Sequence, residues 1–404
     1  MTELAAAATS FAVEPESNEF EKISREEMIA RAKAFIPILR ERAARTEALR
    51  QLPQDTYEDF RRAKIFRIAQ PAPYGGVGLD IDTINDVVFE LARGDPSAAW
   101  VAGFFALHNH TLGTYEKAAQ DEYWADSFDL NMATASAFVR GGFEDTDQGV
   151  IVTGEWDFSS GIPNADWLQI YRFEGKTQQL LIPRHSVEIV DVWHTMGARA
   201  TGSNRVKLDK VLVPPHRCLD ATLAARGQSY GRKAYPSVYY KLPSPMWGGS
   251  GVASIIVGAA QGMIDCLVEQ APRRREMTTG EKFIERPANQ RRLAVSSVEI
   301  DSARLLLKEN SRLCYEWGMA EYEPTMLERA TMRRNMTYCV KLALDASYRI
   351  FEVAGAHAIY DESHIQRAYR DVSAMSHALA ITWDVPLEQY GRVAWGLPPN
   401  SPML

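Results

Sequence analysis

The chain has 404 residues, too many for one hydrophobic core, so its length predicts two or three packed domains. Hydrophobic residues make up 46% and charged residues 24% of the sequence, an ordinary globular balance that excludes a mostly disordered chain. The net charge of −7 argues against nucleic acid or an anionic membrane surface as a partner, because neither attracts an acidic protein.

The N-terminal residues predict a lead-in followed by a helix. Residues 1–22 are rich in alanine and acidic residues and lack the basic start and apolar run of a signal peptide, so we expect them to be disordered. Ser24 and Glu27 have the spacing of a capping box, which predicts that an amphipathic helix begins there and extends to Arg45.

Two further signals complete the first third of the chain. The stretch Pro71–Gly78 contains three glycines that allow positive φ angles, and we expect it to form a turn. Asp95 followed by Pro96 has the pattern of an N-cap and a first-turn proline. This pattern predicts an apolar helix over Ser97–Tyr115.

The middle of the chain consists of short runs rich in β-branched residues, separated by Gly, Pro, Asn and Asp. We expect these runs to form a small, mostly antiparallel sheet domain that Pro214–Pro215 closes. The runs are Val150–Thr153, Leu168–Tyr171, Gln179–Ile182, Val187–Val192 and Val206–Val213.

From about Ser244 onward, apolar residues recur with a helical period, which predicts long helices packed as an antiparallel bundle. Three stripes carry this prediction: Leu293, Ile300, Leu307 and Cys314; Met336, Val340, Ala343 and Ile350; and Ile365, Val372 and Leu379. We therefore expect an N-terminal helical domain over residues 23–130, a β domain over 131–228 and a C-terminal helical bundle over 229–404.

Several common kinds of site lack their motif in this chain. The glycines of Pro71–Gly78 do not extend to GxGxxG, no GxxxxGK[ST] occurs, and Ser250 lacks the GxSxG spacing of a nucleophile elbow. A di-iron site in the bundle needs two Glu-x-x-His pairs, and none of the eight histidines has a glutamate three residues before it. We therefore expect no metal site.

The cysteine pattern and hydropathy bear on location. Cys218, Cys266, Cys314 and Cys339 are far apart and form no CxxC pair, which fits free thiols in a reducing compartment. No run of 18 apolar residues occurs, so we expect no membrane span and a cytoplasmic protein.

Five segments, in order along nearly the whole chain, resemble motifs of acyl-CoA dehydrogenase-like proteins, and the last resembles a monooxygenase subgroup of that fold. The segments are Pro71–Gly78 (PxxYGGxG), Trp156–Gly161 (a flavin-contacting loop), Trp193–Ser203 with Val211–Pro214 (GxRxTGS and VxVP), Ala354–His357 (a glycine turn), and Gln366–Asp371 with His377 and Trp383–Asp384. The chain is therefore similar to the group D flavin-dependent monooxygenases, which include oxygenase components of p-hydroxyphenylacetate, steroid and dibenzothiophene oxygenases. The resemblance implies an acyl-CoA dehydrogenase-like fold: an N-terminal helical domain, a middle antiparallel β domain and a C-terminal four-helix bundle.

One departure favours the monooxygenases over the dehydrogenases. Acyl-CoA dehydrogenases place a catalytic glutamate in a YEGT-like segment near the C-terminus. The corresponding stretch here is Trp383–Gly391, in which Glu388 is followed by glutamine. The base that abstracts an α-proton from an acyl thioester is therefore not evident.

The activity that the resemblance implies is that of the oxygenase component of a two-component system. Such a protein takes reduced FMN or FADH2 from a separate NAD(P)H-dependent flavin reductase. It reacts with O2 through a C4a-hydroperoxide and hydroxylates an aromatic or heteroaromatic small molecule. Two alternatives stay open. The first is another flavin enzyme, either an acyl-CoA dehydrogenase-like oxidoreductase or an amine N-oxygenase. The second is a helical interaction protein that kept the fold without the cofactor.

The loop after Trp156 is the first candidate for the flavin site. Reduced flavin needs a polar partner for its N5–H in a dry cavity, and a hydroxyl on a tightly turned loop suits this. Ser159 or Ser160, next to Gly161 and backed by Trp156 and Phe158, supplies one. The structural alternative is an ordinary β-turn.

The other candidates rest on the resemblance. It implies that His377 lies at the flavin site, where a neutral imidazole deprotonates a phenol-like substrate or stabilises the peroxide. It implies that His108 contacts a substrate hydroxyl and that Ser136 lines the same pocket, while Thr201 and Ser203 contact the flavin or only shape a turn. Any of these side chains could instead be purely structural.

Two arginines complete the predicted cofactor site. Within Arg273–Arg275, Arg274 corresponds approximately to an arginine that holds the cofactor phosphate from a neighbouring subunit, and Arg370 belongs to the motif that includes His377. A phosphate contact across an interface requires an oligomer, and the resemblance implies a homotetramer. The link into the bundle is rich in aromatic residues that either cover the pocket or pack between domains: Tyr230, Tyr235, Tyr239, Tyr240 and Trp247.

Overall fold

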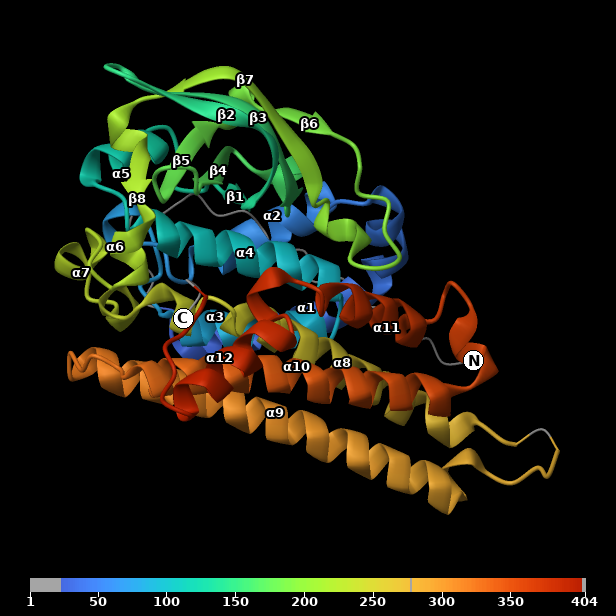
Figure 1. The fold of residues 1–404 in the computed structure, drawn as a ribbon. Helices are drawn as coiled ribbons and strands as arrows, with labels where there is room; N and C mark the ends of the chain where they lie inside the picture. The colour runs from blue at the N-terminus through green and yellow to red at the C-terminus, as the bar shows by residue number, and fades with distance from the viewer. Residues whose placement is uncertain (1–22, 277, 402–404) are drawn as a thin grey trace.

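Helices make up most of the described chain and flank a group of strands (Figure 1). The computed structural model describes residues 23–276 and 278–401, so the lead-in predicted at 1–22 lies outside the described residues. The α-helices are α1 (Arg25–Leu49), α2 (Gln54–Arg62), α3 (Ile81–Ala92), α4 (Pro96–Leu112), α5 (Lys117–Tyr123), α6 (Ala221–Ala225), α7 (Gly231–Ala234), α8 (Ser250–Gln270), α9 (Pro287–Met319), α10 (Met326–Ala354), α11 (His364–Met375) and α12 (Asp384–Ala394). The strands are β1 (Met132–Ala135), β2 (Ala137–Thr146), β3 (Gly149–Ser159), β4 (Trp167–Arg172), β5 (Gln178–Pro183), β6 (Glu188–Val190), β7 (Asn204–Val213) and β8 (Cys218–Asp220).

The two helix starts predicted from capping residues are confirmed. The Ser24 hydroxyl accepts a hydrogen bond from the Glu27 backbone N–H at 3.2 Å, at the start of α1. The Asp95 carboxylate accepts one from the Ala98 N–H at 3.1 Å, with Pro96 in the first turn of α4. The second cap matters for the site, because α4 carries several of its side chains.

The strands form two four-stranded sheets, in the orders β1-β4-β5-β8 and β2-β3-β7-β6. Only the β1–β4 pair is parallel among the named strands, so the expected mostly antiparallel arrangement is confirmed. All five predicted runs overlap strands, β3 to β7. The prediction missed β1 and β2 because the first is alanine-rich and the second is largely exposed, with adjacent glycines. Pro214–Pro215 does not close the sheets, since β8 follows it and pairs with β5.

The predicted bundle is present, with one correction. Of the first two stripes, all members except the half-buried Leu293 are buried, on α9 and α10. The third stripe is wrong at its last member, because α11 ends at Met375 and Leu379 is 68% exposed. The chain turns at Ser376 and His377 into a short 3₁₀ segment, Leu379–Ile381, so the helical period does not continue.

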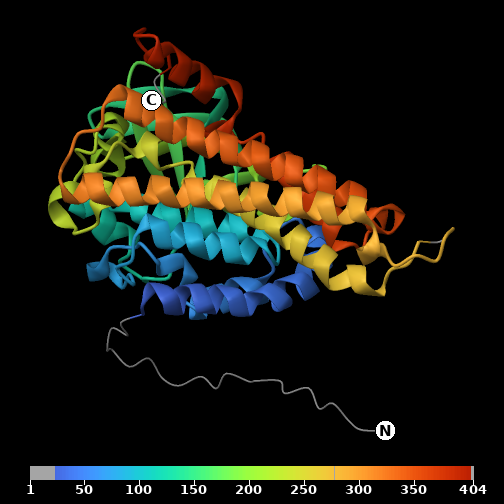
Figure 2. The same ribbon diagram turned by 90° about the horizontal axis from the view of Figure 1, so that it is seen from below.

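The two helical regions pack directly on each other although the sheets separate them in sequence. Helix α3 packs against α8, and α4 contacts both β1 and α8. In Figure 1 the sheets lie above α4 and the bundle lies below it. Figure 2, turned by 90°, shows the long helices α9 and α10 side by side across the molecule. Helix α4 therefore lies where the three regions meet. The domain boundaries at 130 and 228 stay predictions.

Helix α8 is a long, strongly apolar core helix. The stretch Ser244–Arg273 is long and apolar enough by composition to cross a membrane, but 78% of its most apolar window is buried inside the protein. Burial against other helices accounts for this apolarity, as in the core helix of a globular protein.

The contact between α3 and α8 depends on Gly258, and this gives a first prediction. A Cβ atom at Gly258 would overlap the Phe89 carbonyl oxygen. We expect Gly258→Ala to lower the free energy of unfolding by about 1–3 kcal/mol, because overpacking outweighs the gain in helix propensity. Gly251→Ala is the matched control on the same helix, since the nearest atom to its Cβ would be Asn85 Oδ1 at 3.7 Å. Urea unfolding measures both, and equal stabilities would contradict the close packing.

Candidate functional site

The loop that follows β3 is held by an unusual backbone conformation. The register of β3 against β7 shifts between Trp156 and Ser159. Within this irregularity Phe158 has φ +63°, which costs energy for a bulky residue and is typical of functional sites. Gly161 has φ +77°, and a Cβ there would lie 2.8 Å from the Phe105 ring. The loop therefore packs tightly on α4.

Three hydroxyl groups predicted from the sequence lie together beside this loop. Ser160 Oγ is 2.7 Å from Ser203 Oγ, and Ser203 Oγ is 2.6 Å from Thr201 Oγ1. At one end Trp100 Nε1 of α4 lies 3.1 Å from Ser160 Oγ. At the other end Thr201 Oγ1 lies 2.8 Å from the Ala198 carbonyl oxygen. We call Ser160, Ser203 and Thr201 the hydroxyl chain.

The two ends of the hydroxyl chain fix the direction of its hydrogen bonds. A carbonyl only accepts, so Thr201 donates its single proton to Ala198. Ser203 must then donate to Thr201, and Ser160 to Ser203. The Trp100 indole N–H donates to Ser160. Ser160 therefore already donates its only hydroxyl proton, and one lone pair remains free. It can take part in a further hydrogen bond only as an acceptor.

The carbonyl that ends the hydroxyl chain belongs to a loop held by α11. The Ala198 N–H donates to Asp371 Oδ1 at 2.7 Å, and the Ser97 hydroxyl donates to Asp371 Oδ2 at 3.3 Å. Arg370 Nη1 donates to the Met196 carbonyl at 2.7 Å. A Cβ at Gly197 would overlap the Arg370 carbonyl oxygen, so only glycine permits this approach. Two adjacent residues of α11 thus hold the loop from Trp193 to Ser203, which we call the 193–203 loop.

Asp371 lies in a buried acidic environment. Burial and the neighbouring Asp95 raise the pKa of Asp371 to about 7, and burial raises the pKa of Asp95 to about 6. Arg370 acts in the opposite direction on Asp371, while Glu47 acts in the same direction as Asp95. Both carboxyls therefore hold a proton in the folded protein at pH values where the unfolded chain has released it.

This environment predicts a pH-dependent stability. Since the folded carboxyl pKa values exceed the ordinary value of about 4, the free energy of unfolding falls as the pH rises from about 4 to about 7. We expect the free energy of unfolding of Asp371→Asn to fall less steeply with pH. Relative to the wild type, the variant should therefore be more stable at pH 8 than it is at pH 5. Urea unfolding at the two pH values measures it. An unchanged slope would show that Asp371 does not titrate in this range.

His108 lies on the same helix as Trp100. Its Nδ1 is 2.7 Å from the Met132 carbonyl oxygen, so Nδ1 carries the proton and Nε2 is an acceptor. Burial lowers the pKa of His108 to about 4, so the ring stays neutral near pH 7. The Phe104 ring lies between the two others, 5.1 Å from Trp100 and 5.4 Å from His108. These residues, four apart, form one face of α4.

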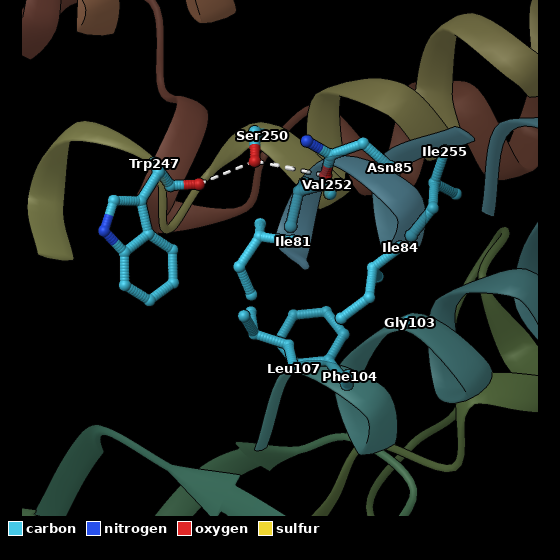
Figure 3. A pocket seen from close by; sticks show the side chains of 11 residues that line it. Ile81, Ile84, Asn85, Gly103, Phe104, Leu107, Trp247, Ser250, Val252 and Ile255 are labelled. Carbon is cyan, nitrogen blue, oxygen red and sulfur yellow. Dashed lines mark hydrogen bonds between the residues drawn. The ribbon is translucent and has the colours of Figure 1, made fainter. Parts of the chain in front are cut away.

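A small cavity adjoins that face (Figure 3). Its volume is about 20 Å³, room for about one water molecule. The Phe104 and Leu107 side chains point into it from α4. At one end the Ser250 hydroxyl contacts the Trp247 carbonyl at 2.7 Å and Asn85 Oδ1 at 3.1 Å. The remaining lining is Ile81 and Ile84 of α3, Gly103 of α4, and Gly251, Val252 and Ile255 of α8. The cavity is thus apolar with one polar end.

The structure places the two serines of the loop differently. Ser159 Oγ is fully buried and has no hydrogen-bond partner within the part of the chain that the structure describes. Trp156 is also fully buried, and its ring contacts Phe138 at 5.4 Å and Phe143 at 6.0 Å between centroids, inside the β domain. Ser160 keeps 8% exposure and belongs to the hydroxyl chain.

Besides His108, Trp156 and Ser159, four further predicted residues lie outside the hydroxyl chain. Ser136 is exposed, between β1 and β2. His377 is exposed, two residues beyond the end of α11, with Nδ1 2.9 Å from the Ser373 carbonyl. The Arg370 guanidinium is bonded to Glu47, Gln366 and the Met196 carbonyl. Arg274 donates to the Ala354 carbonyl at 2.7 Å and lies 4.4 Å over the Phe283 ring.

Sequence reasoning missed three residues of the site. Trp100 had a readable signal, since it lies two turns before His108 on one helical face. Asp371 belongs to the segment Gln366–Asp371, but the sequence indicated no role for its side chain. Thr134 on β1 has a buried hydroxyl without a hydrogen-bond partner among residues 23–276 and 278–401, two residues from the Met132 carbonyl that His108 contacts. Its strand was not predicted, so nothing in the sequence pointed to it.

An exposed aromatic surface lies beside the hydroxyl chain. Phe158 is 62% exposed, and its ring centroid is 6.1 Å from that of the half-buried Trp193. Met196 on the same loop is also exposed. Exposed apolar side chains next to an unfilled acceptor suit a flat, partly polar ring system. The residues present therefore fit a flavin.

Comparisons with known proteins place the chain among flavin-dependent oxygenases by sequence and fold. The family model described as acyl-CoA dehydrogenase, C-terminal domain, matches residues 250–381. The oxygenase subunit HsaA of a flavin-dependent monooxygenase from Rhodococcus jostii is 31% identical over 384 residues, covering 93% of this chain and 100% of that protein. The oxygenase component of p-hydroxyphenylacetate 3-hydroxylase from Acinetobacter baumannii is 29% identical, covering 93% and 91%. The crystal structure of 3-HSA hydroxylase from Rhodococcus sp. RHA1 superposes with a TM-score of 0.88 at 29% identity, covering 94% and 99%.

Proposed function

The chain belongs to the oxygenase subunits of flavin-dependent monooxygenases, and on that premise we propose that it hydroxylates an aromatic or heteroaromatic small molecule. The reduced flavin, FMN or FADH2, comes from a separate NAD(P)H-dependent reductase and supplies the activation of O2. The observation that carries the proposal is the direction of the hydroxyl chain, which leaves Ser160 as an acceptor.

An acceptor at this position favours the reduced cofactor. Reduced flavin carries a hydrogen on N5, whereas oxidised flavin presents a bare nitrogen that only accepts. Ser160 can accept a hydrogen bond from the N5–H of reduced flavin. It has no proton to donate to the bare N5 of oxidised flavin, because it already donates its own to Ser203. We therefore assign the N5 contact to Ser160 and not to Ser159, whose hydroxyl is fully buried. Thr201 and Ser203 act through Ser160.

The substrate side of the site lies along α4. The His108 Nε2 atom accepts the hydrogen bond of a substrate hydroxyl, and the substrate ring system lies along the face of α4 that carries Phe104 and His108. A ring with a pKa of about 4 is far too weak a base to remove a phenol proton with a pKa near 10. His108 therefore orients the hydroxyl, while the exposed His377 is the residue proposed for proton exchange. Ser136 is proposed to line the entrance to the pocket.

The assembly and location complete the proposal. Arg274 lies in the connection between α8 and α9, at one end of the bundle. We propose that Arg274 holds the flavin phosphate of a neighbouring copy in a homotetramer, and that Arg370 supports the site through the 193–203 loop. Exposed Val295, Val298 and Leu305 on α9 support contacts between bundles. The proposed location is the cytoplasm.

Isotope-labelled oxygen tests the proposed function. The purified protein is supplied with reduced flavin, ¹⁸O₂ and a panel of phenols and indoles, and the products are analysed by mass spectrometry. We expect one labelled oxygen atom in at least one hydroxylated product. Hydrogen peroxide as the sole oxygen product across the panel, together with bleaching of bound oxidised flavin by an acyl-CoA, would overturn the proposal in favour of a dehydrogenase.

A further inference from the structure

Ala198 is strained in this fold. It has φ +55° and ψ +28°, the left-handed conformation that costs a non-glycine residue about 1–2 kcal/mol. Its carbonyl oxygen accepts from both Thr201 Oγ1 at 2.8 Å and Trp193 Nε1 at 2.9 Å. This one residue therefore sets where the hydroxyl chain ends.

The group that opposes the strain is on α11. The Ala198 N–H donates to Asp371 Oδ1 at 2.7 Å, across 173 residues of sequence. The other oxygen of Asp371 accepts from Ser97 at the start of α4, the helix that also carries Trp100. Asp371 is thus bonded to the loop at one end of the hydroxyl chain and to the helix at its other end.

We propose that Asp371 is a positioning residue that holds Ala198 in its left-handed conformation and so keeps the hydroxyl chain aligned for the flavin. The inference rests on the proposed function only for the role of the flavin. The geometry of the loop stands without it. Asp371 acts through Ala198, Thr201 and Ser203, and makes none of the contacts assigned to cofactor or substrate.

A competing explanation is that hydrogen bonds within the 193–203 loop are enough to maintain its conformation. The Thr195 hydroxyl donates to the Gly197 carbonyl at 2.8 Å, and Arg199 Nε donates to the Thr195 carbonyl at 2.7 Å. If these local bonds suffice, Asp371 is only a buried packing residue. The two explanations differ in what happens to the backbone amides of the loop when the carboxylate is removed.

Hydrogen–deuterium exchange of the flavin-free protein separates these explanations. We expect Asp371→Ala to raise the exchange rate of the 193–203 loop amides by about tenfold, with the peptides of β4 and β5 unchanged. Asp371→Asn should restore the wild-type rate, because its side-chain oxygen still accepts from Ala198. Adding Ala198→Gly to Asp371→Ala should recover part of the protection, because glycine adopts the left-handed conformation without strain. Wild-type exchange in Asp371→Ala would overturn the proposal.

Glu90→Ala is the matched control for loss of a buried carboxylate. Glu90 is 2% exposed against 4% for Asp371, and it forms ion pairs with Arg93 at the end of its own helix α3 and with Arg304 of α9. Among the described residues it makes no hydrogen bond to the 193–203 loop. We expect it to lower stability without changing exchange in the loop. Faster loop exchange in this variant would assign the effect to general destabilisation and overturn the positioning role.

Anaerobic titration with reduced FMN tests whether Asp371 affects flavin binding. We expect the dissociation constant to rise about tenfold in Asp371→Ala and to stay within about twofold of wild type in Asp371→Asn. If the wild type does not bind reduced flavin, the proposed function fails while the exchange result still decides the role of Asp371. If loop exchange rises but the dissociation constant is unchanged, Asp371 shapes the loop without aligning the flavin site, which contradicts the proposal.

Discussion

Replacing His108 by alanine is expected to lower kcat/KM for hydroxylation by about 10²–10³-fold, while oxygen consumption continues. The substitution removes the acceptor that orients the substrate hydroxyl, and a site built around such a bond loses this much when the bond is absent. Because the flavin contact at Ser160 is intact, the oxygen consumed should appear as hydrogen peroxide. Paired assays of product and peroxide measure this uncoupling.

A control and a pH profile sharpen the result for His108. His110→Ala removes another fully buried ring of α4, one that stacks on Tyr240 at 4.1 Å between centroids, and should reduce stability without uncoupling. Since burial lowers the pKa of His108 to about 4, its protonation should leave no inflection between pH 5 and 9. Equal uncoupling in both variants would remove His108 from the substrate site.

Replacing Ser160 by alanine is expected to raise the dissociation constant of reduced flavin by about 10–100-fold. The variant loses the acceptor for N5–H and leaves the Trp100 indole N–H without its partner, which together cost about 1–3 kcal/mol. Return of oxidised flavin absorbance after mixing with O2 should become faster, and the product yield should fall. Anaerobic fluorescence titration and stopped-flow absorbance measure these effects.

Ser159→Ala is the comparison for Ser160. The two serines are adjacent and both buried, but among the described residues only the Ser160 hydroxyl has hydrogen-bond partners. We expect the Ser159 variant to bind reduced flavin within about twofold of wild type. A larger effect at Ser159 than at Ser160 would reverse the assignment of the N5 contact.

The fold was largely readable because its signals are local. The cap at Asp95, the seven-residue spacing from Ile300 to Cys314 and the β-branched runs each specify one element without reference to the others. The missing strands had no such signal: β1 is Met-Ala-Thr-Ala, and its pairing with β4 is set by tertiary contacts. The end of α11 was misplaced because no glycine or proline marks it.

The sequence predicted several residues of the site but not the hydrogen bonds that connect them. Resemblance gave Ser160, Thr201 and Ser203, and the structure shows that they are bonded in series. The direction of that series depends on Trp100 and the Ala198 carbonyl. These groups lie far from the loop in sequence or belong to the backbone. A sequence motif cannot show which way a proton points.

A pair of anaerobic titrations of the wild-type protein, one with reduced and one with oxidised flavin, tests the role of Ser160 most directly. Because Ser160 can only accept, it pairs with the N5–H of reduced flavin and repels the bare N5 of oxidised flavin. We expect reduced flavin to bind at least about tenfold more tightly than oxidised flavin, a difference of about 1.4 kcal/mol in binding free energy. Equal binding of the two forms, or tighter binding of oxidised flavin, would contradict it.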